Sequence, residues 1–208
     1  MTNKEVTRHA HDAIAKRYYE LYKDDKTDLN YFDEFLSTCG KKILDLGCGM
    51  GHYPKYMKNK GFDVTGVDFS KKMVKIAKKI CPRTKFYVSD ICDLKVLNKQ
   101  TFDGVVLAYV LQHLSKDEVE NFMKNLNSYL NTGAKMLLFV REGNQVLIEE
   151  EPIDSNYKYI INEYTNSEIT EVLERNGWNV TSTRIKQKIN DPYSLAPDTM
   201  VVFAERKL

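Results

Sequence analysis

Three glycines and a carboxylate early in the chain have the types and spacing of a small-ligand site. The segment 41–53, KKILDLGCGMGHY, runs from an apolar stretch through Asp45 into glycines at alternate positions, Gly47, Gly49 and Gly51. Glycine adopts positive φ readily and lets a ligand approach the backbone. A helix that begins just after such a turn points its N–H groups and positive dipole end at the ligand. We therefore expect a ligand to bind where this segment ends.

The glycine spacing distinguishes between classes of ligand. A dinucleotide turn reads Gly-x-Gly-x-x-Gly, whereas here the third glycine falls two places after the second, and no Lys-Ser/Thr pair of a P-loop follows. Asp68 ends the next apolar stretch, where a carboxylate can accept hydrogen bonds from both hydroxyls of a ribose. The pattern favours a ribose-containing ligand over a pyrophosphate, and it leaves a nicotinamide dehydrogenase as a distant alternative.

Short apolar stretches alternate with amphipathic ones along the chain. Strands are expected at residues 43–46, 62–68, 85–90, 102–109 and 134–140, and helical spacing covers 53–60, 70–80 and 115–130. Ser70 and Ser115 stand at N-cap positions. Two late strand candidates, 178–187 and 199–206, are close in sequence and should pair antiparallel. The order predicts an α/β fold: a doubly wound, mostly parallel sheet with helices on both faces.

Four motifs in this order, DLGCGMG, VTGVDFS, YVSDICDL and FDGVVLAYVLQHL, resemble the class I S-adenosylmethionine-dependent methyltransferases of the small-molecule type. YTNSEITEVLERNGWNV is similar to that family's penultimate helix and strand, and DAIAKRYYELY resembles its N-terminal helix, which closes over the cofactor. The resemblance implies a single Rossmann-like domain with a seven-stranded sheet and an antiparallel last strand. It divides the chain into an N-terminal helical cap (1–40), a cofactor-binding core (41–140), an acceptor-side loop (141–165) and a C-terminal helix with antiparallel strands (166–208).

The same resemblance implies a set of contacts to S-adenosylmethionine, with S-adenosylhomocysteine as product. The methionine end would face Asp45 (through water to the ammonium), Gly47, Cys48, Gly49, Gly51, Ala108 and Tyr109. The nucleoside would contact Asp68 at the ribose hydroxyls, Phe69 and Met73 beside the adenine, Asp90 at the adenine amino group and Ile91 against the ring, with Tyr18 covering the pocket. Structural roles stay open beside these: Asp45 can cap a turn, Asp90 can cap the helix after it, and Met73 and Ile91 can be core residues.

Few residues are candidates for a catalytic base. His113 follows the fourth strand and is the tentative catalytic residue, although it can equally be a polar residue that opens the next helix. His52 begins the helix after the glycine turn and either lines the pocket or faces solvent. His9 and His11 lie on a polar helix and are expected to face solvent.

The acceptor is expected to lie near the end of the fifth strand. Arg141 and Glu142 end that strand, and Tyr157 follows in the segment 141–165, which carries further glutamates and tyrosines. Loops at strand ends commonly carry specificity. An acidic, tyrosine-bearing segment fits a neutral or cationic small molecule better than a phosphate or RNA, although it can also be a solvated surface loop.

Composition and missing motifs narrow the function further. Lys+Arg of 31 against Asp+Glu of 29 leaves a net charge of +2, which gives no reason to expect a polyanionic partner. No stretch approaches the ~18 apolar residues of a membrane-spanning helix. The four cysteines show no metal-ligand spacing, so we expect no metal, reduced thiols and a cytoplasmic protein. The fourth strand is not followed by the Asn/Asp-Pro-Pro-aromatic turn of the family's nucleic-acid amino-group methylases.

These observations predict a methyltransferase, a monomer or homodimer, that acts on a small-molecule acceptor mainly by proximity and in-line orientation. A tRNA-modifying methyltransferase and a non-catalytic, cofactor-binding partner subunit remain as alternatives.

Overall fold

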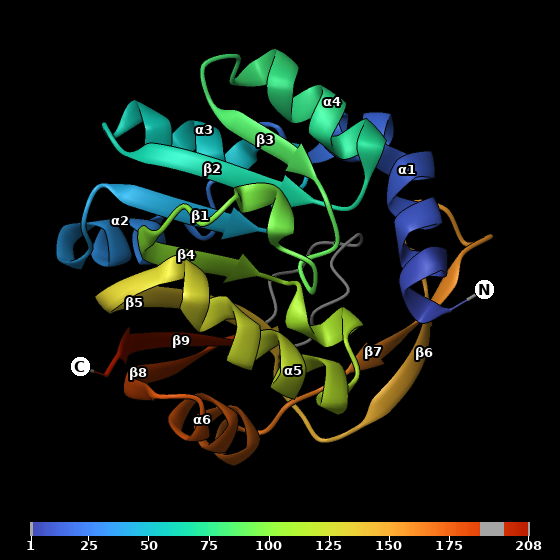
Figure 1. Cartoon of the computed structure of the whole chain (residues 1–208). Coiled ribbons are helices and arrows are strands. Elements are labelled where there is room, and N and C mark those ends of the chain that lie inside the picture. The colour runs from blue at the N-terminus through green and yellow to red at the C-terminus, as the bar shows by residue number, and fades with distance from the viewer. Residues whose placement is uncertain (1, 188–197, 208) are drawn as a thin grey trace.

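The computed structural model describes residues 2–187 and 198–207, and a seven-stranded sheet forms its centre (Figure 1). Its strands are β1 (Lys42–Leu46), β2 (Asp63–Asp68), β3 (Lys85–Val88), β4 (Phe102–Ala108), β5 (Leu130–Arg141), β8 (Trp178–Gln187) and β9 (Asp198–Arg206), in the order β3-β2-β1-β4-β5-β9-β8. Strands β1 to β5 pair in parallel, and β9 lies antiparallel between β5 and β8. The predicted fold class is confirmed, including the antiparallel last strand.

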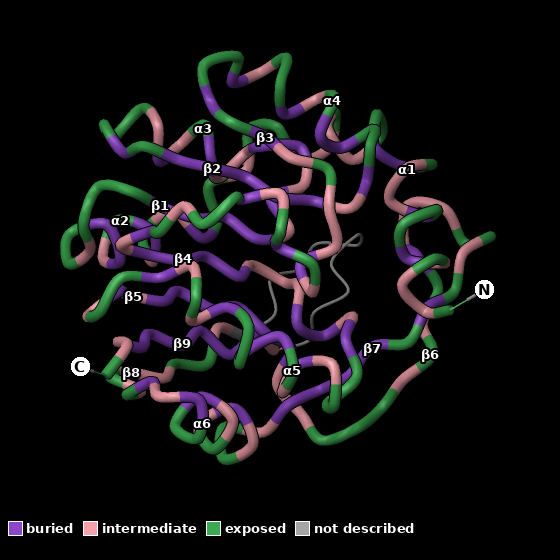
Figure 2. Tube along the Cα trace, in the orientation of Figure 1, coloured by how far each residue is buried: buried purple, intermediate pink, exposed green. Residues whose placement is uncertain are grey.

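Helices cover both faces of the sheet because successive strand residues alternate between two apolar clusters. Leu107 and Leu138 belong to a cluster with α5 (Lys116–Leu126) and α6 (Asn166–Arg175). The intervening strand residues, such as Val106, pack instead with α2 (Leu29–Thr38) and α3 (His52–Asn59). The tube in Figure 2 shows these central strands as buried and the outer turns of the helices as exposed. A period of two in the strand side chains therefore explains why one sheet carries two separate cores.

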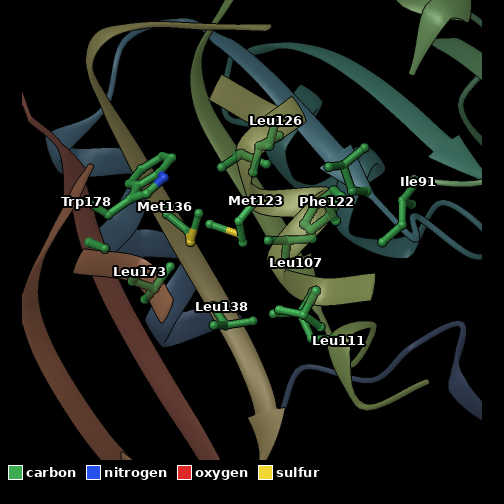
Figure 3. Close-up of a cluster of buried hydrophobic side chains, with 14 of the residues drawn as sticks. Ile91, Leu107, Leu111, Phe122, Met123, Leu126, Met136, Leu138, Leu173 and Trp178 are labelled. Atoms are coloured by element: carbon green, nitrogen blue, oxygen red, sulfur yellow. The ribbon is translucent and has the colours of Figure 1, made fainter. Parts of the chain in front are cut away.

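The core beside α5 is built around large side chains from distant parts of the chain. Figure 3 shows Phe122 and Met123 of α5 facing Leu107 of β4, with Trp178 and Leu173 closing the far side. Trp178 is fully buried, and its indole N–H donates to the Asn127 side-chain oxygen at 3.1 Å.

Helix starts follow the capping signals in the sequence. The Ser70 hydroxyl accepts from the Met73 N–H at 3.1 Å at the start of α4 (Lys71–Ile80). Ser115 forms a complete capping box with Glu118 at the start of α5. The expected extension of α5 to residue 130 is wrong: it ends at Leu126, a single 3₁₀ turn (η3, Asn127–Tyr129) follows, and β5 begins earlier than expected.

The segment after β5 is not the loop expected for residues 141–165. It forms a two-stranded antiparallel sheet, β6 (Val146–Glu150) with β7 (Lys158–Asn162). Helix α1 (Asn3–Tyr22) lies beside this hairpin (Figure 1). Two hydrogen bonds join them: the Ile160 N–H donates to Asn3 at 2.8 Å, and the Asn3 amide donates to the Ile160 carbonyl at 3.2 Å. An isolated two-stranded hairpin is marginally stable, and packing of Tyr159 and Ile161 against Ala10 of α1 supplies the burial it needs.

Candidate functional site

A cavity of about 780 Å³ opens at the carboxyl ends of the parallel strands. Its walls come from the glycine turn, the ends of β2 and β4, the segment after β3, helix α1, the turn between β6 and β7 and the facing ends of β8 and β9. Ligands of open parallel sheets bind at this edge, near the point where the strand order reverses, which here lies between β1 and β4. The volume is in the range of small-molecule sites.

The glycine turn after β1 is folded as its residue types require. Gly47 has φ of 75°, and a Cβ at that position would lie 2.1 Å from a methyl group of Val110. The N–H groups of Gly47 and Cys48 both donate to the Val67 carbonyl, at 2.8 and 3.0 Å. Gly51, at φ of 83°, is the N-cap of α3. The turn thus ties the end of β1 to the end of β2 and exposes backbone to the cavity.

Asp68 lines the cavity at the end of β2 and is held by backbone donors. Its two oxygens accept from the Gly49 N–H at 2.9 Å and the Ser70 N–H at 2.8 Å. Burial raises the pKa of this carboxyl to about 6, although the two N–H groups act in the opposite direction. Each carboxylate oxygen keeps lone-pair capacity beyond its one backbone bond, so Asp68 can accept further hydrogen bonds from a ligand.

Asp45 on β1 is 1% exposed, and neither of its oxygens has a hydrogen-bond partner among the described residues. Burial, with the nearby charge of Asp68, raises its pKa to about 8. It lies behind the cavity wall rather than in it. A buried carboxyl without a partner is costly. A positively charged group or an ordered water would satisfy it.

Most of the predicted cofactor residues meet around this cavity. Those that line it are Tyr18, Gly47, Cys48, Gly49, Asp68, Phe69, Met73, Asp90, Ile91, Ala108 and Tyr109, together with the candidate base His113. Asp45 and Gly51 lie outside the lining. Their individual roles toward a cofactor remain predictions.

Asp90, after β3, has a partner from the N-terminal helix that the sequence did not indicate. Lys4 of α1 donates to its carboxylate at 3.1 Å and pairs with Glu118 of α5 at 2.9 Å. The Cys92 N–H also donates to Asp90 at 2.9 Å. The ion pairs of Lys4 hold the start of α1 beside Asp90 and α5 at the wall of the cavity.

Two histidines face each other inside the cavity. His11 and His113 both line it, with ring centroids 5.9 Å apart, so the expectation that His11 faces solvent is wrong. Burial lowers the pKa of His11 to about 4 and of His113 to about 3, and the His113 Nδ1 has no partner among the described residues. Both imidazoles are neutral at physiological pH. His52 also lines the cavity, while His9 is exposed.

The three residues expected on the acceptor side lie outside the cavity lining. Arg141 is 5% exposed and bound to Glu163 at 3.1 Å and Glu149 at 2.7 Å, so its charge is used inside the fold. The Glu142 N–H donates to the Asp198 carbonyl, and Tyr157 packs against α1. Arg141 and Glu142 lie at the end of β5, as the sequence predicted, but none of the three side chains lines the cavity.

Sequence reasoning missed a polar cluster on the β4 and β8 side of the cavity. Asp28, Tyr53 and Lys186 line it together with Tyr109, and Asp28 accepts hydrogen bonds from the other three. Tyr109 has a positive φ of 62°, unusual for a non-glycine residue. The cluster members come from four separate elements, and no local motif marks them.

Within the described residues, no group of three or more His, Cys, Asp or Glu side chains is arranged to hold a metal ion. All four cysteines are free thiols. None of the described helices is both long and apolar enough to span a bilayer.

Comparison with known proteins agrees with the fold and the glycine turn. Residues 43–133, from β1 to the start of β5, match a family described as a methyltransferase domain. That match covers residues 43–133 alone, and the fold of the whole chain is the one seen in class I S-adenosylmethionine-dependent methyltransferases. An uncharacterized methyltransferase of Alkaliphilus oremlandii is 32% identical to this domain over 95 residues, which are 46% of this chain and 43% of that protein. A ubiquinone biosynthesis O-methyltransferase of Coxiella burnetii is 29% identical over 111 residues, or 52% and 47% of the two chains. The chain thus spans less than half the length of these curated relatives.

Solved structures show the same methyltransferase fold at low sequence identity. The magnesium protoporphyrin IX methyltransferase of Synechocystis PCC 6803, solved with bound S-adenosylmethionine, superposes with a TM-score of 0.73 at 17% identity, covering 100% of this chain and 98% of that one. The 1,6-didemethyltoxoflavin N1-methyltransferase of Burkholderia thailandensis gives a TM-score of 0.75 at 16% identity, covering 100% and 92%. At this identity the likeness concerns the fold.

Proposed function

We propose that this methyltransferase domain binds S-adenosylmethionine and methylates a small molecule. The observation that carries the proposal is the pair of buried carboxylates beside the glycine turn. Asp45 lacks any partner among the described residues and suits the ammonium of the methionine end, through water. Asp68 is fixed by two backbone N–H groups and suits the ribose hydroxyls. The residues present therefore fit the cofactor that the domain family implies.

S-adenosylmethionine, when bound, supplies a methyl group that is already activated on a sulfonium. The task left to the chain is to align the acceptor and exclude water. Such alignment can lower the activation free energy by on the order of 7–11 kcal/mol. His113 is the predicted catalytic residue. Because burial lowers its pKa to about 3, it is a weak base, and we propose that its neutral imidazole accepts a hydrogen bond that orients the acceptor.

The cavity lining favours a small acceptor over RNA. Acidic lining residues (Asp24, Asp25, Asp28, Asp68, Asp90 and Glu151) outnumber the basic ones (Lys4 and Lys186). This balance disfavours a polyphosphate backbone, whose binding depends on lysine and arginine. Helix α1 and the β6–β7 hairpin also enclose the cavity. The ubiquinone biosynthesis relative is named for a small-molecule reaction, which is consistent with this proposal.

Calorimetry with S-adenosylhomocysteine tests the cofactor half of the proposal. We expect binding by the intact chain and at least a tenfold loss in Asp68→Ala, because the ribose hydroxyls lose their acceptor. Asp63→Ala is the matched control. This aspartate lies at the amino end of the same strand, β2, and outside the cavity. No binding by the wild type, or equal binding by Asp68→Ala, would contradict the proposal.

Methyl transfer from a tritiated donor separates the alternatives. Label in small-molecule extracts and none in bulk RNA is the expected result. Label in RNA would favour the tRNA-modifying alternative. Cofactor binding without label in either pool would favour the non-catalytic partner subunit.

A further inference from the structure

The polar cluster of Asp28, Tyr53, Tyr109 and Lys186 joins four elements around one buried carboxylate. Asp28, 4% exposed at the start of α2, accepts from the Tyr53 hydroxyl at 2.8 Å and the Tyr109 hydroxyl at 2.9 Å. Lys186, near the end of β8, donates to the other oxygen of Asp28 and also to the Tyr109 hydroxyl at 3.2 Å. All four side chains line the cavity.

The cluster is maintained at a cost in stability. Asp28 is the N-cap of α2, yet its side chain makes no capping hydrogen bond, because both oxygens are used by the cluster. Tyr109 holds a left-handed backbone conformation, with φ of 62°, which is unfavourable for a non-glycine residue. A buried ion pair adds little net stability. Strained residues and buried pairs that persist in this way concentrate at functional sites.

The unused hydrogen-bonding capacity of the cluster defines what it can bind. The Lys186 ammonium has three N–H donors, and within residues 2–187 and 198–207 two of them have partners, Asp28 and Tyr109. The Tyr109 hydroxyl gives its hydrogen to Asp28. Each oxygen of Asp28 already has a donor. Among the described residues the third N–H of this ammonium has no acceptor, and a ligand oxygen with lone pairs would supply one.

The surrounding residues restrict the acceptor further. Aromatic rings of Tyr18, Tyr53, Tyr109 and Tyr159 line the same cavity and suit a planar ligand. Asp24 and Asp25, which follow α1, and Asp28 make the wall around Lys186 acidic. A carboxylate or phosphate group that extends beyond the ammonium is disfavoured by this wall, whereas a single hydroxyl oxygen can lie against the ammonium itself.

We propose that Lys186 binds the hydroxyl oxygen of an uncharged aromatic acceptor and favours its ionised form. This inference rests on the proposed function and adds the substrate class, a phenol-type hydroxyl compound. On binding, the O–H bond breaks, its electron pair stays on the oxygen beside the Lys186 ammonium, and the proton passes to a water or buffer base. An ammonium within hydrogen-bond distance lowers the pKa of such a hydroxyl. Asp28 and Tyr109 are positioning residues that fix the ammonium.

The ionisation of a chromogenic phenol gives a readout that requires no turnover. Wild-type protein saturated with S-adenosylhomocysteine is titrated with 4-nitrophenol in buffer below the pKa of the free phenol. We expect the visible band of the phenolate to grow with protein concentration. Its amine counterpart, 4-nitroaniline, cannot ionise in this way and should give no such band.

Variants assign the effect to Lys186. Lys186→Met should bind the phenolate at least tenfold more weakly, about 1.4 kcal/mol. Lys186→Arg, which keeps the charge and protects the fold from an unpaired Asp28, should retain the band. The matched control is Lys135→Met, which breaks a lysine–carboxylate pair with Glu205 at 2.7 Å on β5 and β9, at the opposite edge of the sheet.

The possible outcomes separate the two proposals. Calorimetry with S-adenosylhomocysteine is run first on every variant, and failure of the wild type to bind it contradicts the proposed function. Normal S-adenosylhomocysteine binding without any phenolate band in the wild type overturns the assignment of Lys186. An unchanged band in Lys186→Met, or an equal loss in Lys135→Met, overturns it as well.

Discussion

Replacing Asp45 by asparagine should make the cofactor-free protein more stable and bind its cofactor more weakly. Burial, with the Asp68 charge, raises the pKa of Asp45 from 3.8 to about 8, so the folded state holds a proton that the unfolded state releases. The free energy of unfolding therefore falls as the pH rises from about 4 to about 8. At about 1.4 kcal/mol per pH unit, the cost is on the order of 4 kcal/mol near neutrality, an upper bound because water that reaches the carboxyl reduces it.

The assay is urea unfolding at several pH values, followed by the fluorescence of Trp178, the single tryptophan, which is fully buried. Asp45→Asn should equal the wild type near pH 4 and gain about 2–4 kcal/mol near neutrality. The same variant should bind S-adenosylhomocysteine at least tenfold more weakly, because the ammonium loses its counter-ion.

Asp63→Asn, the same change at an exposed position on β2, should shift the free energy of unfolding by less than about 0.5 kcal/mol. An Asp45→Asn variant whose free energy of unfolding does not exceed that of the wild type near neutrality would contradict this prediction. A stability gain that does not change between about pH 4 and about pH 8 would also refute it.

Three further outcomes follow from the packing and the buried groups. Phe32→Ala should lower the free energy of unfolding by about 3–5 kcal/mol in urea titration, because this ring is fully buried under the sheet. Gly47→Ala should lower both stability and calorimetric cofactor affinity, because its Cβ would lie 2.1 Å from Val110 at a φ of 75°. In an NMR titration, His11 and His113 should stay neutral down to about pH 4 or below, against an unfolded pKa of 6.5. Because the unfolded state binds these protons first, the free energy of unfolding should be highest above pH 6.5 and should fall as the pH drops toward about 4. An imidazole that titrates near its ordinary pKa would show that it is solvated.

Local signals predicted that the glycine turn and Asp68 come together, because these residues lie close together in sequence. The turn Gly47–Gly51 directly follows β1, and Asp68 ends the next strand, so a parallel sheet brings them together without further information. The capping residues Ser70 and Ser115 are local in the same way.

Other parts depended on contacts between distant segments. The β6–β7 hairpin was missed because its apolar runs, residues 146–148 and 159–161, are short and lie in a segment rich in acidic residues, and their pairing shows only in the folded chain. His11 was assigned to solvent because its helix is polar, and it is the placement of α1 over the cavity that buries it. Arg141 lies at the end of β5, as expected, but its side chain is bound by Glu149 of β6 and by Glu163, which follows β7.

The amino-acid sequence by itself determined the doubly wound sheet and the glycine turn with Asp68 at the end of the next strand, because hydrophobic period, turn chemistry and strand-end carboxylates act over short stretches of chain. Only the tertiary structure brought together the polar cluster that we propose for the acceptor. Asp28 and Lys186 are 158 positions apart and meet because β8 pairs with β9 at one edge of the sheet while α2 packs across its face. Residues that far apart in the chain form no sequence motif, so the cluster can be recognised only in the folded protein.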